Sequence, residues 1–205
     1  MSKITFYHNP RSRAVMAHWM LEEAGADYEI RHIDFEKGEN RDPEFLAINP
    51  LGKLPTIVVD GTAITETPAI IAWIADACPA AKLAPPIGSP ERGTWYRWLF
   101  FGGSCFEPAL TDKMFNRPAP DNAGALGWGS FDVVLAALEQ ALDPGPYLLG
   151  ETFSAADVYI GSELNWAMMF GAPGVKDNPV FSGYVERLTA RPAYRRTLEA
   201  ASGDA

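Results

Sequence analysis

Residues 52–61 read Gly-Lys-Leu-Pro-Thr-Ile-Val-Val-Asp-Gly, with a proline where a loop becomes a β-branched strand. Proline has no N–H for a sheet ladder, so it is normally found at sheet edges and strand starts. An X-Pro bond in such a turn is a candidate for the cis form. A cis Leu54-Pro55 bond presents the N–H and C=O of Leu54, unpaired, to a neighbouring cleft. Glu66 and Thr67 follow at a predicted helix start. Together these groups fit a peptide-like ligand.

Bulk composition narrows the class of protein. The 205 residues fit one large domain or two small ones, and 47% are hydrophobic, which is enough for a core. The net charge of -9 argues against partners such as nucleic acid and anionic membranes. Residues 1–10 lack the apolar core of a secretory signal. The longest apolar run, residues 69–74, is too short to span a bilayer. We therefore expect no nucleic acid and no membrane partner.

The cysteines and histidines indicate neither a disulfide-linked fold nor a metal site. The two cysteines, Cys78 and Cys105, form neither a disulfide framework nor a metal set, so a cytoplasmic location is expected. The three histidines, His8, His18 and His32, show no metal-ligand spacing, and no metal site is predicted. His18 falls in a predicted helix and His32 in a predicted strand, where structural roles are expected.

The first 78 residues predict an α/β domain of order βαβαββα. A helix joins the first two strands, which favours a parallel pair. Asp60-Gly61 is a strong hairpin signal, so the last two strands are predicted to be antiparallel. The predicted strands are 4–8, 28–34, 56–59 and 63–64, and the predicted helices are 13–24, 42–47 and 67–77.

The remainder of the chain is predicted to be all-helical. Residues 79–90 contain four prolines and no periodicity, which is typical of a linker. The predicted domains are therefore 1–79, with a linker at 80–90, and 91–205. Gly102-Gly103 is predicted to bend the first helix of the second domain. The predicted helices are 91–115, 127–142, 155–170, 179–190 and 192–200.

One motif in the second half is a helix start. Ser154 and Asp157 have the spacing of a capping box, in which the serine oxygen takes the N–H of Asp157 and the aspartate reaches back to the N–H of Ser154. We expect Asp157 to be structural and assign it no catalytic role.

Three motifs, in this order and at these distances, resemble the cytosolic glutathione transferase family. Leu54-Pro55 resembles its cis-proline, Glu66-Thr67 its acidic–hydroxyl pair, and Ser154-x-x-Asp157 its capping box. The resemblance covers nearly the whole chain. It implies an N-terminal thioredoxin-like domain followed by an all-helical domain, usually in a homodimer, with glutathione as co-substrate.

The resemblance implies that glutathione binds along the backbone of Leu54 and Pro55. Leu54 can pair with the cysteinyl unit as an added strand. Glu66 can pair with the γ-glutamyl ammonium, and Thr67, at a helix N-terminus, can bind the γ-glutamyl carboxylate. Lys53 can meet the glycine carboxylate. Each has a structural alternative: Thr67 as a helix cap, and Glu66 and Lys53 as solvated surface charges.

The thiol must become a thiolate. Its ordinary pKa is about 8.5, and a two-unit drop needs about 2.7 kcal/mol of preferential stabilisation. Within the family, Ser12 or Tyr7 would supply the hydroxyl, and Asn9, Arg11 and Arg13 remain alternatives, with Arg13 also counted among the glutathione-binding candidates. Ser12 can instead cap the helix, and Tyr7 can be a core residue. No cysteine lies in this loop, so disulfide exchange by a cysteine of the protein's own is not expected.

The second substrate is predicted to be a small apolar electrophile. Trp95, Trp98 and Phe101 follow helical spacing and would line its pocket, or else form a core or interface. The predicted activity is glutathione transfer. The alternatives are a glutathione-dependent isomerase or dehalogenase on the same scaffold, and a non-catalytic binding protein. The Glu66-Thr67 pair favours an enzyme.

Overall fold

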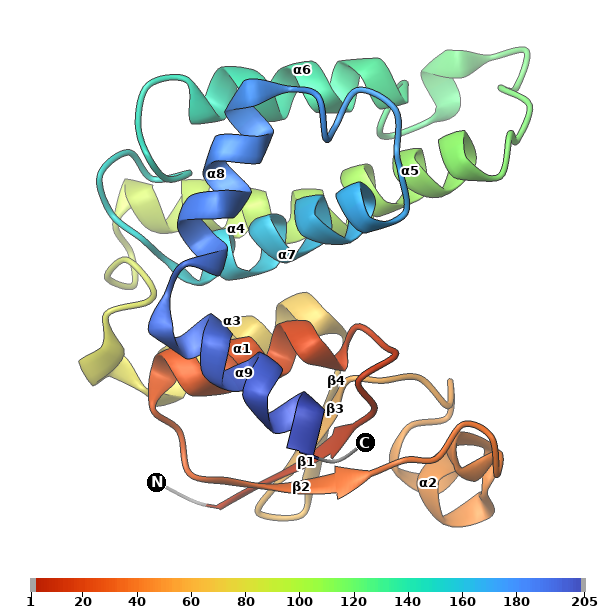
Figure 1. Cartoon of the computed structure of the whole chain (residues 1–205), viewed down its shortest axis with the longest axis vertical. Coiled ribbons are helices and arrows are strands. Elements are labelled where there is room, and N and C mark those ends of the chain that lie inside the picture. Colours follow the sequence, from red (N-terminus) through yellow and green to blue (C-terminus); the bar gives the residue numbers. More distant parts are fainter. Residues whose placement is uncertain (1–2, 204–205) are drawn as a thin grey trace. The chain divides into compact units, whose positions relative to one another are not determined.

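The structure is a computed structural model that describes residues 3–203 and divides into two compact units (Figure 1). Within the described residues, the sheet unit comprises 3–83 and 191–203, and the helical unit comprises Ala84–Ala190. The last helix, α9 (Pro192–Gly203), therefore groups with the sheet unit. The domain boundaries read from the sequence, 1–79 and 91–205, stay a prediction, and their end residues 1–2 and 204–205 lie outside the described part.

The sheet unit contains the predicted mixed sheet. Its strands are β1 (Ile4–His8), β2 (Tyr28–His32), β3 (Thr56–Val59) and β4 (Thr62–Thr65), in the order β2-β1-β3-β4. The β1–β2 pair is parallel and the β3–β4 pair is antiparallel, which confirms both sequence predictions. The second strand ends at His32 rather than at Asp34, because the Ile33 carbonyl accepts a hydrogen bond from the Asn9 side chain.

Alternate side chains of β1 point to opposite faces of the sheet, and different helices cover the two faces. Ile4, Phe6 and His8 are buried, and the Phe6 ring lies 5.8 Å from that of His18 in α1 (Ala14–Ala24). Figure 1 shows α1, α3 (Thr67–Ala77) and α9 on this side of the sheet. Side chains alternate along a strand, so Tyr7 points to the other face. There its ring centroid lies 5.4 Å from that of Phe45 in α2 (Pro43–Ile48). A 3₁₀ turn at Glu39–Arg41 precedes α2, and another at Pro79–Ala81 follows α3.

Two ion pairs fasten α9 to α1. The Arg191 guanidinium donates to both carboxylate oxygens of Glu23, at 2.6 and 2.8 Å. Arg196 donates to Glu22 at 2.6 Å. Glu22 also accepts a 2.6 Å hydrogen bond from the Tyr28 hydroxyl, so this second pair joins β2, α1 and α9.

The helical unit has the predicted helices, with small differences at their ends. The predicted helix 91–115 is divided where the sequence indicated a bend: α4 (Pro90–Phe101) and α5 (Glu107–Met114) are separated by a π-helical segment, Gly102–Phe106. This segment begins at Gly102-Gly103, and a Cβ at Gly102 would stand 2.4 Å from the Tyr159 ring, so glycine fits there. The remaining helices are α6 (Phe131–Leu142), α7 (Ala155–Met169) and α8 (Pro179–Thr189), with a 3₁₀ turn at Ala123–Ala125.

The predicted capping box is present at the start of α7. The Ser154 N–H donates to the Asp157 carboxylate at 2.8 Å. The same carboxylate also accepts from the Leu148 N–H at 2.9 Å and from the Tyr184 hydroxyl at 2.9 Å. Asp157 is fully buried, and its interactions are all with the helical unit's own groups. The structural role predicted for Asp157 accounts for these contacts.

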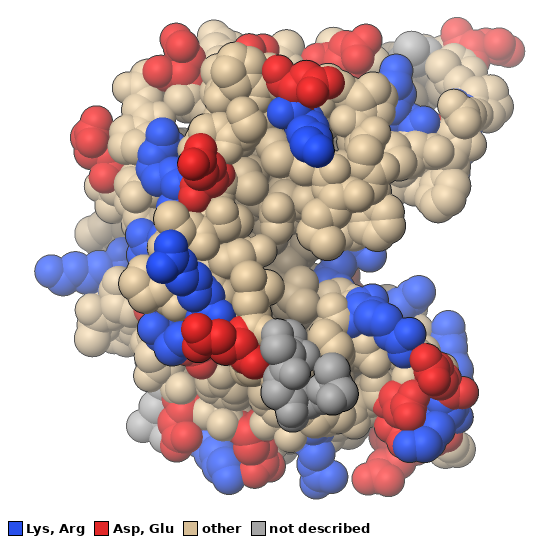
Figure 2. Space-filling model, in the orientation of Figure 1, with Lys and Arg blue, Asp and Glu red and all other residues tan. Residues whose placement is uncertain are grey.

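Basic and acidic side chains are interspersed on the face drawn in Figure 2, with uncharged surface between them. Lys and Arg gather into no continuous patch on that face. Among the helices of residues 3–203, none has the length and apolar character required to cross a membrane.

Candidate functional site

The predicted glutathione residues converge on one edge of the sheet. In the parallel pair His8 lies opposite His32, and in the antiparallel pairs Tyr7 lies opposite Thr56 and Thr56 opposite Thr65. The segments that follow β1, β2 and β4 therefore meet the segment that precedes β3. We call this boundary the site edge. It brings together 9–13, 33–37, 53–55 and 66–67, which lie far apart in the sequence.

Leu54 and Pro55 form the start of β3. Their peptide bond is cis, as predicted. The side chains of both residues are buried, so the backbone is what this turn can offer to a ligand. Among residues 3–203, the N–H and C=O of Leu54 have no hydrogen-bond partner. An unpaired donor and acceptor on one residue is the arrangement that pairs with an extended peptide.

The loop that carries Leu54 is held by Asn49. Its side-chain N–H₂ donates to the Lys53 carbonyl at 2.9 Å and lies 3.0 Å from the Thr56 hydroxyl. That hydroxyl in turn donates to the Lys53 carbonyl at 3.1 Å. Gly52 has a φ of 61°, and a Cβ there would meet the Asn40 carbonyl oxygen at 2.6 Å, so only glycine fits. The Leu54 backbone is thus presented by a fixed loop.

Glu66 and Thr67 follow β4 at the same edge. Glu66 has φ 67° and ψ 120°, a conformation that costs a non-glycine residue on the order of 1–3 kcal/mol. Its side chain is exposed and makes no cap to α3. Thr67 is buried and begins that helix, whose N-terminal N–H groups favour an anion. Such a backbone outlier beside an uncapped helix start is typical of a binding site.

Ser12 occupies the loop between β1 and α1. Its hydroxyl donates to the Asn9 carbonyl oxygen at 2.7 Å and accepts from the Ala14 N–H at 3.2 Å. The side chain is half-buried, directly before the helix. Arg13 is the N-cap residue of α1 but makes no side-chain cap. Both capping and a role toward a thiol are therefore compatible with the position of Ser12.

Tyr7 and Lys53 are placed less favourably. Tyr7 packs on Phe45, on the sheet face opposite to α1, and its hydroxyl makes no hydrogen bond within residues 3–203. Lys53 is exposed, and its ammonium makes no ion pair in the described part of the chain. The roles assigned to both residues remain predictions.

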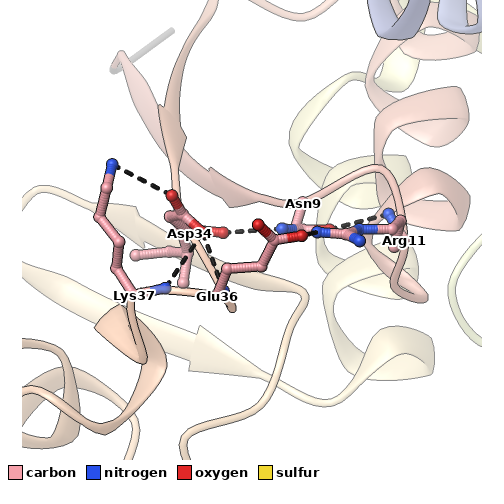
Figure 3. Close-up of polar contacts among 6 residues, drawn as sticks. Asn9, Arg11, Asp34, Glu36 and Lys37 are labelled. Atoms are coloured by element: carbon pink, nitrogen blue, oxygen red, sulfur yellow. Dashed lines mark hydrogen bonds and ion pairs between the residues drawn. The ribbon is translucent and has the colours of Figure 1, made fainter. Parts of the chain in front are cut away.

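A hollow that sequence reasoning missed lies beside the loop between β1 and α1. It has a volume of about 460 Å³, and its lining residues are Asn9, Pro10, Arg11, His32, Ile33, Asp34, Glu36, Lys37 and Glu39. Arg11 pairs with Glu36 at 2.8 Å, and Lys37 pairs with Asp34 at 3.1 Å (Figure 3). The hydrogen bond from Lys37, with the N–H groups of Glu36 and Lys37, holds the pKa of Asp34 below its ordinary value. Residues 9–12 were predicted as a loop, and Asn-Pro favours a turn, but no local signal pairs this loop with residues 32–39.

The aromatic residues predicted to line the electrophile pocket lie in the helical unit. Trp95 and Trp98 are 0% and 1% exposed, whereas Phe101 is partly exposed. The Arg92 guanidinium stacks 4.2 Å from the centroid of the Trp95 ring. Burial suits the core interpretation of the two tryptophans, and the pocket role of all three residues remains a prediction.

The three histidines cluster in the sheet unit. The His8 ring lies 5.2 Å from His18 and 5.9 Å from His32. The His18 Nε2 atom lies 2.9 Å from the Tyr28 hydroxyl. In the described part of the chain, no three His, Cys, Asp or Glu side chains are grouped so that they could hold a metal ion. These contacts are consistent with packing roles for the histidines.

Two family models match the chain. The model described as "Glutathione S-transferase, N-terminal domain" matches residues 2–76, and the one described as "Glutathione S-transferase, C-terminal domain" matches residues 121–196. The first includes the site edge, and the second includes the capping box at the start of α7.

Individual relatives are similar over nearly their full length. Glutathione S-transferase 3 of Zea mays is 30% identical over 215 residues, which cover 98% of this chain and 95% of that protein. Glutathione S-transferase GstA of Escherichia coli O157:H7 is 26% identical over 199 residues, covering 95% and 96%. A solved structure of a sphingomonad glutathione S-transferase complexed with glutathione has a TM-score of 0.79 and 32% identity, covering 97% of this chain and 98% of that one.

Proposed function

Because this chain belongs to the glutathione S-transferase family, we propose that it is a glutathione transferase that binds glutathione at the site edge. The bound thiol loses its proton to solvent there, and the thiolate forms a carbon–sulfur bond with a small apolar electrophile; with an activated aryl halide, the carbon–halogen bond breaks and halide leaves. The observation that carries this proposal is the unpaired N–H and C=O of Leu54 beside the cis bond to Pro55. These groups match the cysteinyl unit, which is the middle residue of glutathione.

The two ends of glutathione need charged partners. In the proposed complex, the exposed Glu66 carboxylate pairs with the γ-glutamyl ammonium, and Thr67 with the first N–H groups of α3 takes the γ-glutamyl carboxylate. Lys53 is proposed for the glycine carboxylate. The strained φ of Glu66 supports the first assignment, since such strain is kept where function requires it.

Ser12 is the proposed thiolate-stabilising group. It lies in the loop after β1, and the continued β1–β3 register sets this loop opposite Leu54. The N-terminus of α1 adds its partial positive charge. Tyr7 is less favoured because it packs on the sheet face away from α1. Arg13, at the first turn of α1, is proposed to assist binding.

Calorimetric titration with glutathione, followed by a conjugation assay with an activated aryl halide, tests the function. We expect binding in the micromolar to millimolar range and conjugate formation above the uncatalysed rate. Binding without turnover of any electrophile in a panel would favour a non-catalytic binding protein. No heat with millimolar glutathione would contradict the proposal.

We further propose a homodimer in the cytoplasm. Tyr96 and Phe100, one turn apart on α4, are 40% and 69% exposed, and large exposed aromatic side chains of this kind favour an interface. Neither Cys78 nor Cys105 forms a disulfide within the described residues, which suits a reducing compartment. Sedimentation of the purified protein, compared with a Phe100→Glu variant, tests the dimer: the variant should sediment as a monomer.

A further inference from the structure

Two asparagine turns flank the site edge and are built alike. Asn9 and Asn49 are each followed by proline, and each is buried, at 8% and 3% exposure. The side-chain oxygen of Asn9 accepts from the Arg11 N–H at 2.8 Å, and that of Asn49 accepts from the Leu51 N–H at 3.1 Å. Both are turns in which an asparagine side chain replaces a backbone acceptor.

Each amide also ties its loop to a second segment. The Asn49 N–H₂ donates to the Lys53 carbonyl and so holds the backbone of the loop that carries Leu54. The Asn9 N–H₂ donates to the Ile33 carbonyl at 2.8 Å and so ties the loop after β1 to the end of β2. Figure 3 shows Asn9 between Arg11 and the segment that carries Asp34 and Glu36.

The backbone carbonyl of Asn9 fixes Ser12 as well. It accepts the Ser12 N–H at 3.1 Å and the Ser12 hydroxyl at 2.7 Å. One buried residue thus sets the direction of the chain at Arg11, the position of Ser12 in the loop and the distance of both from β2.

We propose that Asn9 is a positioning residue for the glutathione thiol: it holds the loop of Ser12 at the place where that loop can stabilise the thiolate. Asn9 acts through Ser12 and does not itself contact the sulfur, because its amide is engaged with Ile33 and Arg11. This inference rests on the proposed function, and it separates two tasks at the site edge. The Asn49 turn sets where the peptide backbone binds, and the Asn9 turn sets how acidic its thiol becomes.

A second link between the same segments is much weaker. The Arg11–Glu36 ion pair joins the loop to the segment after β2, but its side chains are 67% and 75% exposed. Exposed pairs contribute little to stability. Breaking the Asn9 tie instead leaves the Ile33 carbonyl without its buried donor, which costs more. The loop position is therefore governed by Asn9.

The test uses Asn9→Ala and Asn9→Ser in the full-length protein. A serine at position 9 can still accept the N–H two residues on, but it is too short to reach the Ile33 carbonyl. The readouts are the pH titration of the ultraviolet thiolate band of bound glutathione, and the affinity for S-methylglutathione, which has no thiol. We expect both variants to raise the pKa of the bound thiol by about one unit, which leaves about tenfold less thiolate at a pH below that pKa. Affinity for S-methylglutathione should stay unchanged.

Three variants serve as comparisons. Glu36→Gln breaks the exposed link alone and should leave the thiol titration unchanged. Asn178→Ala removes the side-chain cap of α8 in the helical unit and should lower stability without moving the titration. Asn49→Ala should give the reverse of Asn9→Ala, with weaker binding of S-methylglutathione and an unchanged thiol pKa.

The outcomes separate this inference from the proposed function. A folded Asn9→Ala protein with an unchanged thiol pKa would overturn the positioning role alone. Rescue by Asn9→Ser would assign Asn9 to the local turn and overturn the proposed tie to β2. Loss of folding in both variants would assign Asn9 to the fold only, which also overturns the inference. If the unaltered protein binds no glutathione, both the inference and the proposed function fail.

Discussion

The Ser12 hydroxyl donates its hydrogen bond to the carbonyl oxygen of Asn9, at 2.7 Å. It also accepts from the Ala14 N–H at 3.2 Å. A hydroxyl has one proton to donate, so in the proposed complex Ser12 exchanges the Asn9 carbonyl for the sulfur when glutathione binds. A thiolate is charged, and hydrogen bonds to charged groups are roughly twice as strong as neutral ones, so this exchange is favourable.

Replacing Ser12 should therefore raise the pKa of the bound thiol. For Ser12→Ala we expect a rise of about one to two units, equal to about 1.4–2.7 kcal/mol of lost thiolate stabilisation. The turnover number should fall while affinity for S-methylglutathione is kept. The thiolate absorbance of the complex, followed against pH, gives the shift. Tyr7→Phe is the matched comparison and should leave the titration unchanged; a shift in Tyr7→Phe alone would move the catalytic assignment to that residue.

Glu66 should govern affinity. A charge-assisted hydrogen bond contributes about 1.5–3 kcal/mol, so Glu66→Gln should weaken glutathione binding by roughly 10- to 150-fold. Calorimetric titration measures the dissociation constant. Glu44→Gln provides the control, since Glu44 is another exposed acid at the start of a helix but lies in α2 and has no proposed contact with glutathione. Equal losses in the two variants would indicate a general charge effect and contradict the Glu66 assignment.

The glycines of α4 and the π-helical segment should respond in opposite directions to alanine. A Cβ at Gly102 would meet the buried Tyr159 ring at 2.4 Å, and overpacking of this kind costs about 1–3 kcal/mol. A Cβ at Gly93 has no atom within 4 Å, and alanine inside a helix is favoured over glycine by roughly 0.5–1 kcal/mol. Urea unfolding should show Gly102→Ala less stable and Gly93→Ala more stable than the parent protein. A neutral Gly102→Ala would mean that the π-helical segment can shift away from Tyr159.

Glu22 should make the sheet unit sensitive to acid. Burial raises its pKa, but hydrogen bonds from Tyr28 and Arg196 outweigh this, and the net pKa lies below the ordinary 4.5. The unfolded chain therefore binds a proton at a higher pH than the folded chain, so stability contributed by Glu22 is present above about pH 4.5 and is lost as the pH falls through the lowered value. Denaturant unfolding between about pH 6 and pH 3 should show a shallower pH dependence for Glu22→Gln. An unchanged slope would contradict this contribution.

Much of the fold could be read from local patterns in the sequence. The short aromatic stretch 4–8, the Asp60-Gly61 turn and the Thr67-Pro68 helix start each specify an element through residues close in sequence, and the structure has all three. The strand after residue 28 was predicted too long, because its end depends on the Asn9 side chain from a distant segment. The start of α6 at Phe131 rather than Gly127 follows from the Ser130 cap, a local signal that was overlooked.

The candidate site could be predicted only in part for the same reason. The cis bond of Leu54-Pro55 and the helix start at Glu66-Thr67 depend on the residues themselves, so both could be predicted from the sequence. The thiolate group could not be chosen from sequence, since Ser12 and Tyr7 both carry hydroxyls and lie within five residues of each other. What separates them is their place in the fold: Tyr7 lies within β1 and packs on Phe45, whereas Ser12 lies in the loop directly before α1. The Asn9 tie to Ile33 likewise joins segments that no local pattern connects.

A crystal structure of the protein soaked with glutathione tests the central claim most directly. We predict that the N–H and C=O of Leu54 both lie at hydrogen-bonding distance, about 2.9 Å, from the cysteinyl unit. The γ-glutamyl carboxylate should lie at Thr67 and the sulfur beside the loop of Ser12. Glutathione bound elsewhere, or a site edge that remains empty at millimolar glutathione, would contradict the account.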